Sequence, residues 1–173
     1  MVTVWAACML IAACNSNAAQ PAQSAPVAAT ALDTAEIKRF DALVSPSAIF
    51  SDPSQRALYK AHAPSTDDGR RSYVFELKHQ PGMTPSRHFH LITITWARAG
   101  TFVTSGGAPR SQSATGGPNG GFIDAAAQTA DKAYDVNVAE AMLLPDAVQV
   151  PDFDLAKAAA ALVQSYNAAA PNR

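Results

Sequence analysis

Three of the four histidines lie close together in the sequence, and imidazole is the side chain most often used to hold transition metals. His79 falls near the end of one alternating segment, residues 72–80, while His88 and His90 open the next, residues 88–98. If the two segments form a hairpin, their apolar faces must lie on the same side, because a slip of one residue would turn every side chain over. The register that satisfies this condition pairs Tyr73 with Ile94, Phe75 with Ile92, Leu77 with His90 and His79 with His88.

Directly opposed side chains have Cβ atoms about 5 Å apart, so this register predicts that the three imidazoles converge at the loop end of one face. A three-histidine site with an open position could hold a divalent metal that activates water or binds a substrate. The alternative is that His79, His88 and His90 only form hydrogen bonds with backbone groups or with each other. Arg87 beside the cluster, suited to an anion, and Trp96 on the same face of the second segment are the candidate ligand-binding residues.

The segment Pro81–His90 resembles the first cupin motif, in which Pro-Gly is followed after five residues by His-x-His. The resemblance covers about ten residues and implies that His88 and His90 are metal ligands. The glutamate of that motif has no counterpart, because residues 93–95 are Thr, Ile and Thr. The histidine of the second cupin motif is also missing, since no histidine follows His90.

The two cysteines, Cys8 and Cys14, both lie near the start of the chain, in a region without charge: the first charged residue is Asp33. Residues 2–13 form a run of about 12 apolar or small residues, shorter than the roughly 20 that a membrane-spanning helix needs but typical of a signal peptide. The run ends Leu10-Ile11-Ala12-Ala13-Cys14.

This ending resembles the lipobox of bacterial lipoproteins, an aliphatic residue and two small residues before the cysteine that receives the lipid. The resemblance implies a signal peptide at 1–13, lipidation at Cys14 and, since residue 15 is Asn rather than Asp, the periplasmic side of the outer membrane. The family's leader carries Lys or Arg near its start, and this one carries none. Residues 15–31 are poor in large apolar groups, so 14–31 is expected to be a flexible tether with a reach of roughly 20–25 Å.

Residues 32–173 are expected to form a single small α+β domain. Asp33 and Glu36 predict a capping box for a first helix that Pro46 ends, and Asp52-Pro53 predicts a second, short helix. Alternation predicts strands at 72–80, 88–98, 101–104, 122–130 and 133–143, and a stripe from Leu155 to Tyr166 predicts a final helix. This order indicates an antiparallel sheet flanked by an N-terminal and a C-terminal helix, with the helices on one side.

The formal net charge of −1, from thirteen basic and fourteen acidic side chains, argues against a nucleic-acid partner. The chain has neither a phosphate-binding GxxxxGK[ST] motif nor the GxSxG of a hydrolase nucleophile. We therefore expect a non-enzymatic envelope lipoprotein without a cofactor, which meets the membrane through its lipid. It would bind an envelope protein or small ligand through the glycine-rich loop 105–121 and an open sheet face, and an inhibitor or immunity-type module is one such role. The alternative is a cupin-like metal-binding protein or metal-dependent enzyme that uses the histidine cluster.

Overall fold

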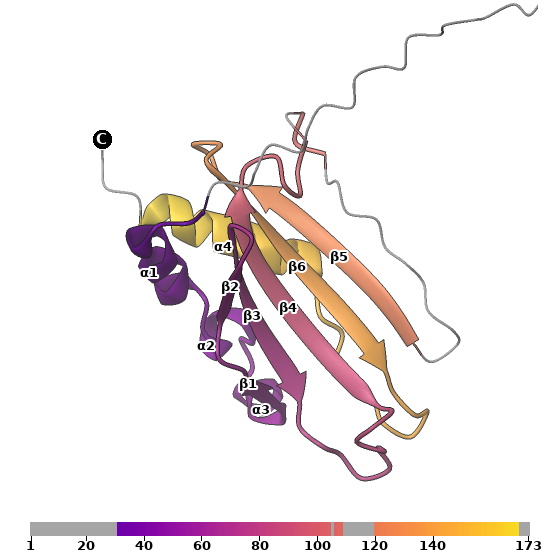
Figure 1. Ribbon diagram of the computed structural model, residues 1–173. Helices are drawn as coiled ribbons and strands as arrows, with labels where there is room; N and C mark the ends of the chain where they lie inside the picture. The colour runs from indigo at the N-terminus through magenta and orange to yellow at the C-terminus, as the bar shows by residue number, and fades with distance from the viewer. Residues whose placement is uncertain (1–30, 105, 109–119, 170–173) are drawn as a thin grey trace, which may run out of the picture.

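An antiparallel sheet of six strands forms the centre of the fold, and the helices lie against one of its faces (Figure 1). The computed structural model describes residues 31–104, 106–108 and 120–169. The strand order is β1-β3-β4-β6-β5, and β2 pairs with β3 beside β1. In chain order the elements are α1 Thr34–Leu43, α2 Pro46–Ile49, α3 Pro53–Leu58, β1 Tyr59–Ala61, β2 Ser65–Asp67, β3 Arg70–Leu77, β4 Phe89–Arg98, β5 Gly120–Gln128, β6 Tyr134–Leu143 and α4 Leu155–Ala168. The α+β class and the flanking helices expected from the sequence are confirmed.

Side-chain caps fix where the longer helices begin. Asp33 and Glu36 form the predicted capping box at the start of α1, each side chain accepting a hydrogen bond from the other's backbone N–H at 2.8 Å. Asp52 caps α3, whose first residue is the predicted Pro53, and Asp154 caps α4. These short polar side chains satisfy N–H groups that have no partner within the helix.

The register predicted for the β3–β4 hairpin is confirmed for two of its four pairs, while the predicted pairs Leu77–His90 and His79–His88 lie beyond the end of the ladder. Tyr73 is opposite Ile94 and Phe75 is opposite Ile92, and these four side chains are all buried on the face that the helices cover. The ladder ends at Glu76 opposite Leu91, so β3 is shorter than predicted and residues 78–80 belong to the connecting loop.

The predicted pairing of β5 with β6 is also confirmed, with a turn that includes Lys132 in a left-handed conformation at a φ of 56°. The third strand predicted at 101–104 is wrong, because the structure has only an isolated bridge at Val103. The backbone N–H groups of Phe102 and Val103 donate instead to the buried carboxylate of Asp135 on β6, at 3.0 and 2.9 Å. The segment therefore crosses one end of the sheet rather than extending it.

The core lies between the covered face of the sheet and the helices α1 and α4. Trp96 on β4 is fully buried and stacks on Phe40 of α1, with ring centroids 4.8 Å apart. Tyr166 of α4 packs against the same indole ring at 5.6 Å and against Tyr134 of β6. All the described helices that pack on the sheet thus use one face, which leaves the other face without a helix.

Candidate functional site: the uncovered face of the sheet

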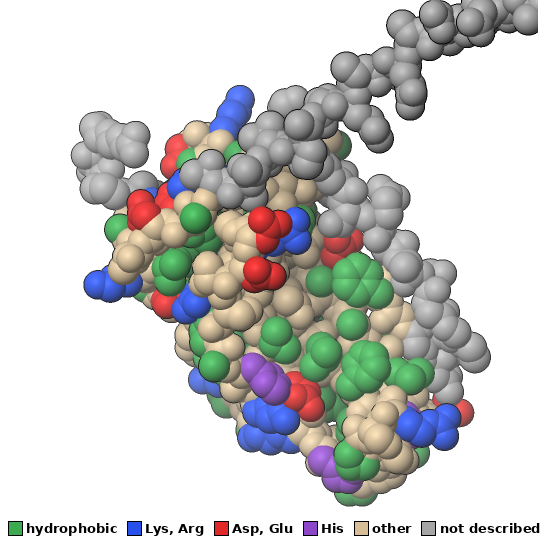
Figure 2. All heavy atoms as spheres, viewed as in Figure 1, with side chains coloured by type: hydrophobic (Ala, Val, Ile, Leu, Met, Phe, Trp, Pro, Cys, Tyr) green, Lys and Arg blue, Asp and Glu red, His purple; other side chains and the backbone are tan. Residues whose placement is uncertain are grey.

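The uncovered face of the sheet carries an apolar surface at the end where β4 begins and β6 ends. Phe89 is opposite Leu143, and Leu91 is opposite Ala141, which is in turn opposite Phe122 on β5. We call these five residues the apolar patch. Figure 2, in the same view as Figure 1, shows hydrophobic side chains gathered over this part of the sheet.

Three large side chains of the apolar patch are exposed to an unusual degree. Phe89 and Phe122 each retain 38% of their accessible surface, and Leu143 retains 40%. They lie on three neighbouring strands that point their side chains to the same side, so they form one surface rather than scattered contacts. Contiguous exposed apolar surface of this kind is typical of a site that binds another molecule.

Charged side chains border the apolar patch along its β3 side. Glu76 is directly opposite Leu91, and its carboxylate accepts from Lys60 at 3.0 Å and from His62 at 2.6 Å. The hydrogen bond from Lys60 lowers the pKa of Glu76 most, and the one from His62 adds to it. The patch is thus flanked by an ion-paired rim, an arrangement common at the edge of binding surfaces.

Beyond the apolar patch, the uncovered face becomes polar. Ser72 and Thr95, on adjacent strands, share a hydrogen bond of 3.1 Å. Asn137 donates to Asp124 across β6 and β5 at 3.0 Å. The side chains of each pair satisfy one another, so this part of the face is more polar than the apolar patch.

His90 lies on the opposite, covered face and is fully buried. Its Nδ1 is 2.8 Å from the Tyr59 hydroxyl and its Nε2 is 2.6 Å from the Glu140 carboxylate. A neutral imidazole satisfies both contacts if the tyrosine donates to Nδ1 and Nε2–H donates to the carboxylate. Burial, and then the charge of Glu140, raises the pKa of Tyr59 far above its usual value, so its hydroxyl keeps the proton. The chain Tyr59–His90–Glu140 therefore joins three elements, β1, β4 and β6.

The other two candidate ligands lie in the loop between β3 and β4. His79 is exposed, and the Nδ1 of His88 accepts the backbone N–H of Thr84 at 2.8 Å. The predicted opposition of His79 and His88 falls beyond the end of the β3–β4 ladder. Within residues 31–104, 106–108 and 120–169 no group of three or more His, Cys, Asp or Glu side chains is arranged around a common metal position. A metal held by His79, His88 and His90 stays a prediction.

The two residues predicted to bind a ligand are placed very differently. Arg87 is exposed in the β3–β4 loop, whereas Trp96 is fully buried beneath α1 and α4. The predicted lipid site, Cys14, and most of the glycine-rich loop 105–121 lie outside the described residues. The apolar patch was not among the predicted sites, although its β4 part had a local signal: Phe89 and Leu91 alternate with the histidine face of the same strand.

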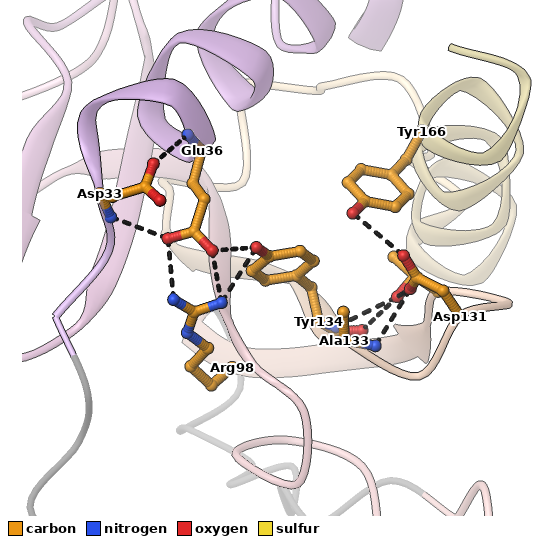
Figure 3. A network of polar contacts seen from close by, with 8 residues as sticks. Asp33, Glu36, Arg98, Asp131, Ala133, Tyr134 and Tyr166 are labelled. Atoms are coloured by element: carbon orange, nitrogen blue, oxygen red, sulfur yellow. Dashed lines mark hydrogen bonds and ion pairs between the residues drawn. The ribbon is translucent and has the colours of Figure 1, made fainter. Parts of the chain in front are cut away.

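A second polar network fastens the start of α1 to the sheet (Figure 3). The Glu36 carboxylate accepts from the Asp33 backbone N–H, from the Arg98 guanidinium at 2.9 Å and from the Tyr134 hydroxyl. Arg98 also donates to the Tyr134 hydroxyl at 3.0 Å. Burial and the hydrogen bond to Glu36 raise the pKa of Tyr134. This network holds the point where residues 1–30 join the described domain, so we assign it a structural role.

Comparisons with protein-family models, with curated proteins and with solved structures found no match to this chain. None of the helices in the described part of the chain has the length and apolar character needed to span a membrane. We therefore infer the function from the chain's own residues.

Proposed function

We propose that this protein is a lipid-anchored binding module of the bacterial envelope, and that it takes a protein partner on the apolar patch. The observation that carries the proposal is the exposure of Phe89, Phe122 and Leu143 on a sheet face that no described helix covers. Covering apolar surface is favourable by about 25 cal/mol per Å², and aromatic side chains contribute strongly at protein interfaces.

The chemistry of the uncovered face favours recognition over catalysis. It presents apolar groups and hydroxyls, and its carboxylates are already engaged, Glu76 by Lys60 and His62 and Asp124 by Asn137. The buried network of Tyr59, His90 and Glu140 lies on the other face, with both His90 ring nitrogens in contact with protein groups. Neutral hydroxyl and amide groups beside an apolar surface can fix the orientation of a bound protein without reacting with it. An inhibitor or immunity-type role requires no more than such a surface.

The proposed cellular address follows from the resemblance of Leu10–Cys14 to a lipobox, which supports an anchor on the periplasmic side of the outer membrane. Expression in a Gram-negative host with labelled palmitate tests it. Cys14→Ser should abolish the label and release the protein from the membrane fraction, whereas Cys8→Ser, in the same leader, should retain both. Label that survives Cys14→Ser would refute the anchor.

Site-specific photo-cross-linking in intact cells tests the binding surface. A benzoylphenylalanine at position 122 or 143 should yield the same discrete cross-linked protein, because both positions lie on the apolar patch. The matched control is the same analogue at Gln164, which is exposed on α4. The product should also be lost when Phe89→Ser is added. Identical products from positions 122 and 164, or none from either patch position, would contradict the proposal.

A further inference from the structure

The two edges of the sheet are built differently. On one edge, β1 and β2 are strands of three residues each, Pro64 lies between them, and Lys60 adds a charge. Short strands, proline and lysine are the features that keep a sheet edge from pairing with another chain. This edge is therefore protected against pairing with another chain, and we call it the guarded edge.

The opposite edge, β5, has none of these features. It is nine residues long, Gly120–Gln128, and contains no proline, lysine or arginine. Its one charged residue is Asp124, whose carboxylate accepts a hydrogen bond from Asn137 of the neighbouring strand and so lies over its own sheet. Within the described part of the chain, β5 pairs with β6 alone.

The middle of β5 is also incompletely packed on both sides of the sheet. Phe122 on the uncovered face and Ile123 on the covered side retain 38% and 41% of their accessible surface. An added strand would pack against both residues at once, because successive side chains of β5 point to opposite faces. An added strand would cover both Phe122 and Ile123, whereas a ligand bound to one face of the sheet would cover only one of them.

We propose that β5 pairs antiparallel with β5 of a second copy of this chain, around a two-fold axis perpendicular to the sheet at Ile123. The axis must pass through a residue position, because paired residues must share a face. An axis at Asp124 would set like charges directly opposite each other, which is unfavourable. An axis at Ile123, the most exposed large apolar side chain of β5, covers that side chain with its own copy and places Phe122 opposite Asp124 of the second copy.

The guarded edge explains why this association would stop at two copies. A head-to-tail contact of β5 with the β1–β2 edge would meet the interruption at Pro64, whereas the β5–β5 contact uses the same surface on both chains and closes. The dimer would also bring the two apolar patches together, because Phe122 belongs to both surfaces. The inference depends on the strand edge and stands apart from the proposed function.

Sedimentation velocity over a dilution series, with the full chain and a reductant that keeps Cys8 and Cys14 from cross-linking, tests the pairing. The wild type should be dimeric at high concentration. Ile123→Lys should weaken association roughly 100-fold, since two lysines would face each other at the axis and juxtaposed like charges repel. Ser65→Lys adds the same charge to the guarded edge on β2 and should leave the dimer intact.

Hydrogen exchange distinguishes this dimer from any other and does not depend on a variant that folds. The amides of β5 should exchange more slowly in concentrated than in dilute wild-type protein, while those of β2 should not change. A wild type that is monomeric throughout, a dimer that Ile123→Lys leaves unchanged, or β5 exchange that is independent of concentration would each overturn the proposal. A monomeric wild type would overturn the dimer but would not affect the proposal that a different protein binds the apolar patch.

Discussion

His90 illustrates how a residue that could bind a metal is used in the core. A buried imidazole must satisfy both ring nitrogens, and Tyr59 and Glu140 provide one partner for each. His90→Ala should lower the free energy of unfolding by about 3–5 kcal/mol, because it leaves a buried carboxylate without its partner. His88→Ala, which removes one exposed hydrogen bond to Thr84, should cost only about 0.5–1 kcal/mol. Urea unfolding of both variants measures the difference.

The same measurement in a chelator separates this role from the metal hypothesis. A metal bound by His79, His88 and His90 would stabilise the wild type, so a chelator would lower its midpoint and the His88→Ala and His90→Ala variants would lose comparable stability. We expect the wild-type midpoint to be unchanged. A midpoint that falls with chelator and is restored by a divalent metal would favour the three-histidine site.

Asp131, in the turn between β5 and β6, gives the domain a component of stability that depends on pH. Burial alone would raise its pKa, but hydrogen bonds from the Thr129 hydroxyl, the Ala133 N–H and the Tyr166 hydroxyl lower it below 3.8, the usual value. A lowered folded-state pKa stabilises the domain above the unfolded pKa, and this contribution disappears as the pH falls through the folded value. Since the residue is exposed, we expect Asp131→Asn to cost only about 0.5–1 kcal/mol near neutral pH. The difference from wild type should shrink as the pH falls below 3.8 and vanish once the pH lies below the folded-state pKa. A difference that does not change with pH would contradict this mechanism.

At the scale of elements, the start of α1 depends on Glu36 more than on its cap. Asp33→Ala removes one capping bond and should cost about 1 kcal/mol. Glu36→Ala removes the reciprocal cap and also the contacts with Arg98 on β4 and Tyr134 on β6, so it should cost at least about 2 kcal/mol. Asp154→Ala, the cap of α4, is the matched control at about 1 kcal/mol. If Asp33→Ala and Glu36→Ala lower the free energy of unfolding equally, the contacts of Glu36 with Arg98 and Tyr134 contribute nothing to stability.

Helices and strands whose sequence signals lie within their own residues could be predicted from the sequence. Caps and apolar spacing located α1, α3 and α4, and matched faces fixed the β3–β4 register. The short elements α2, β1 and β2 were missed, because three or four residues carry too little periodicity to be recognised. The strand predicted at 101–104 failed for a non-local reason, since its N–H groups bond to Asp135, over 30 residues away.

The candidate site shows the same division between local and distant causes. The sequence placed His90 on an apolar face, but its partner Glu140 is fifty residues further along and enters only because β6 lies beside β4. The apolar patch likewise requires the order β4-β6-β5, in which the last strand along the chain lies inside the sheet. No local pattern determines that order, so Phe89 and Phe122 could not be placed on one surface from the sequence.

At the scale of the whole molecule, the one-sided arrangement of helices creates the surface on which the proposed function depends. A sheet with one uncovered face normally alternates apolar and polar side chains, and the uncovered face here follows that rule at Ser72, Thr95 and Asn137 but departs from it at the apolar patch. Apolar side chains exposed to water are unfavourable. A partner that covers the patch would offset this cost.

A fluorescent dye that binds apolar surface, anilinonaphthalene sulfonate, should therefore bind the folded protein at neutral pH, under conditions where near-ultraviolet circular dichroism shows fixed tertiary packing. Phe89→Ser together with Leu143→Ser should reduce the bound fluorescence several-fold and lower the free energy of unfolding by about 2–4 kcal/mol, because each side chain is still more than half buried. Ile37→Ser, at a half-buried position on α1, is the control that removes an apolar side chain elsewhere. If the dye binds wild type and the double variant equally, the apolar patch is not the accessible surface. If it binds only as near-ultraviolet circular dichroism is lost, the dye reports loosened packing rather than a native recognition site.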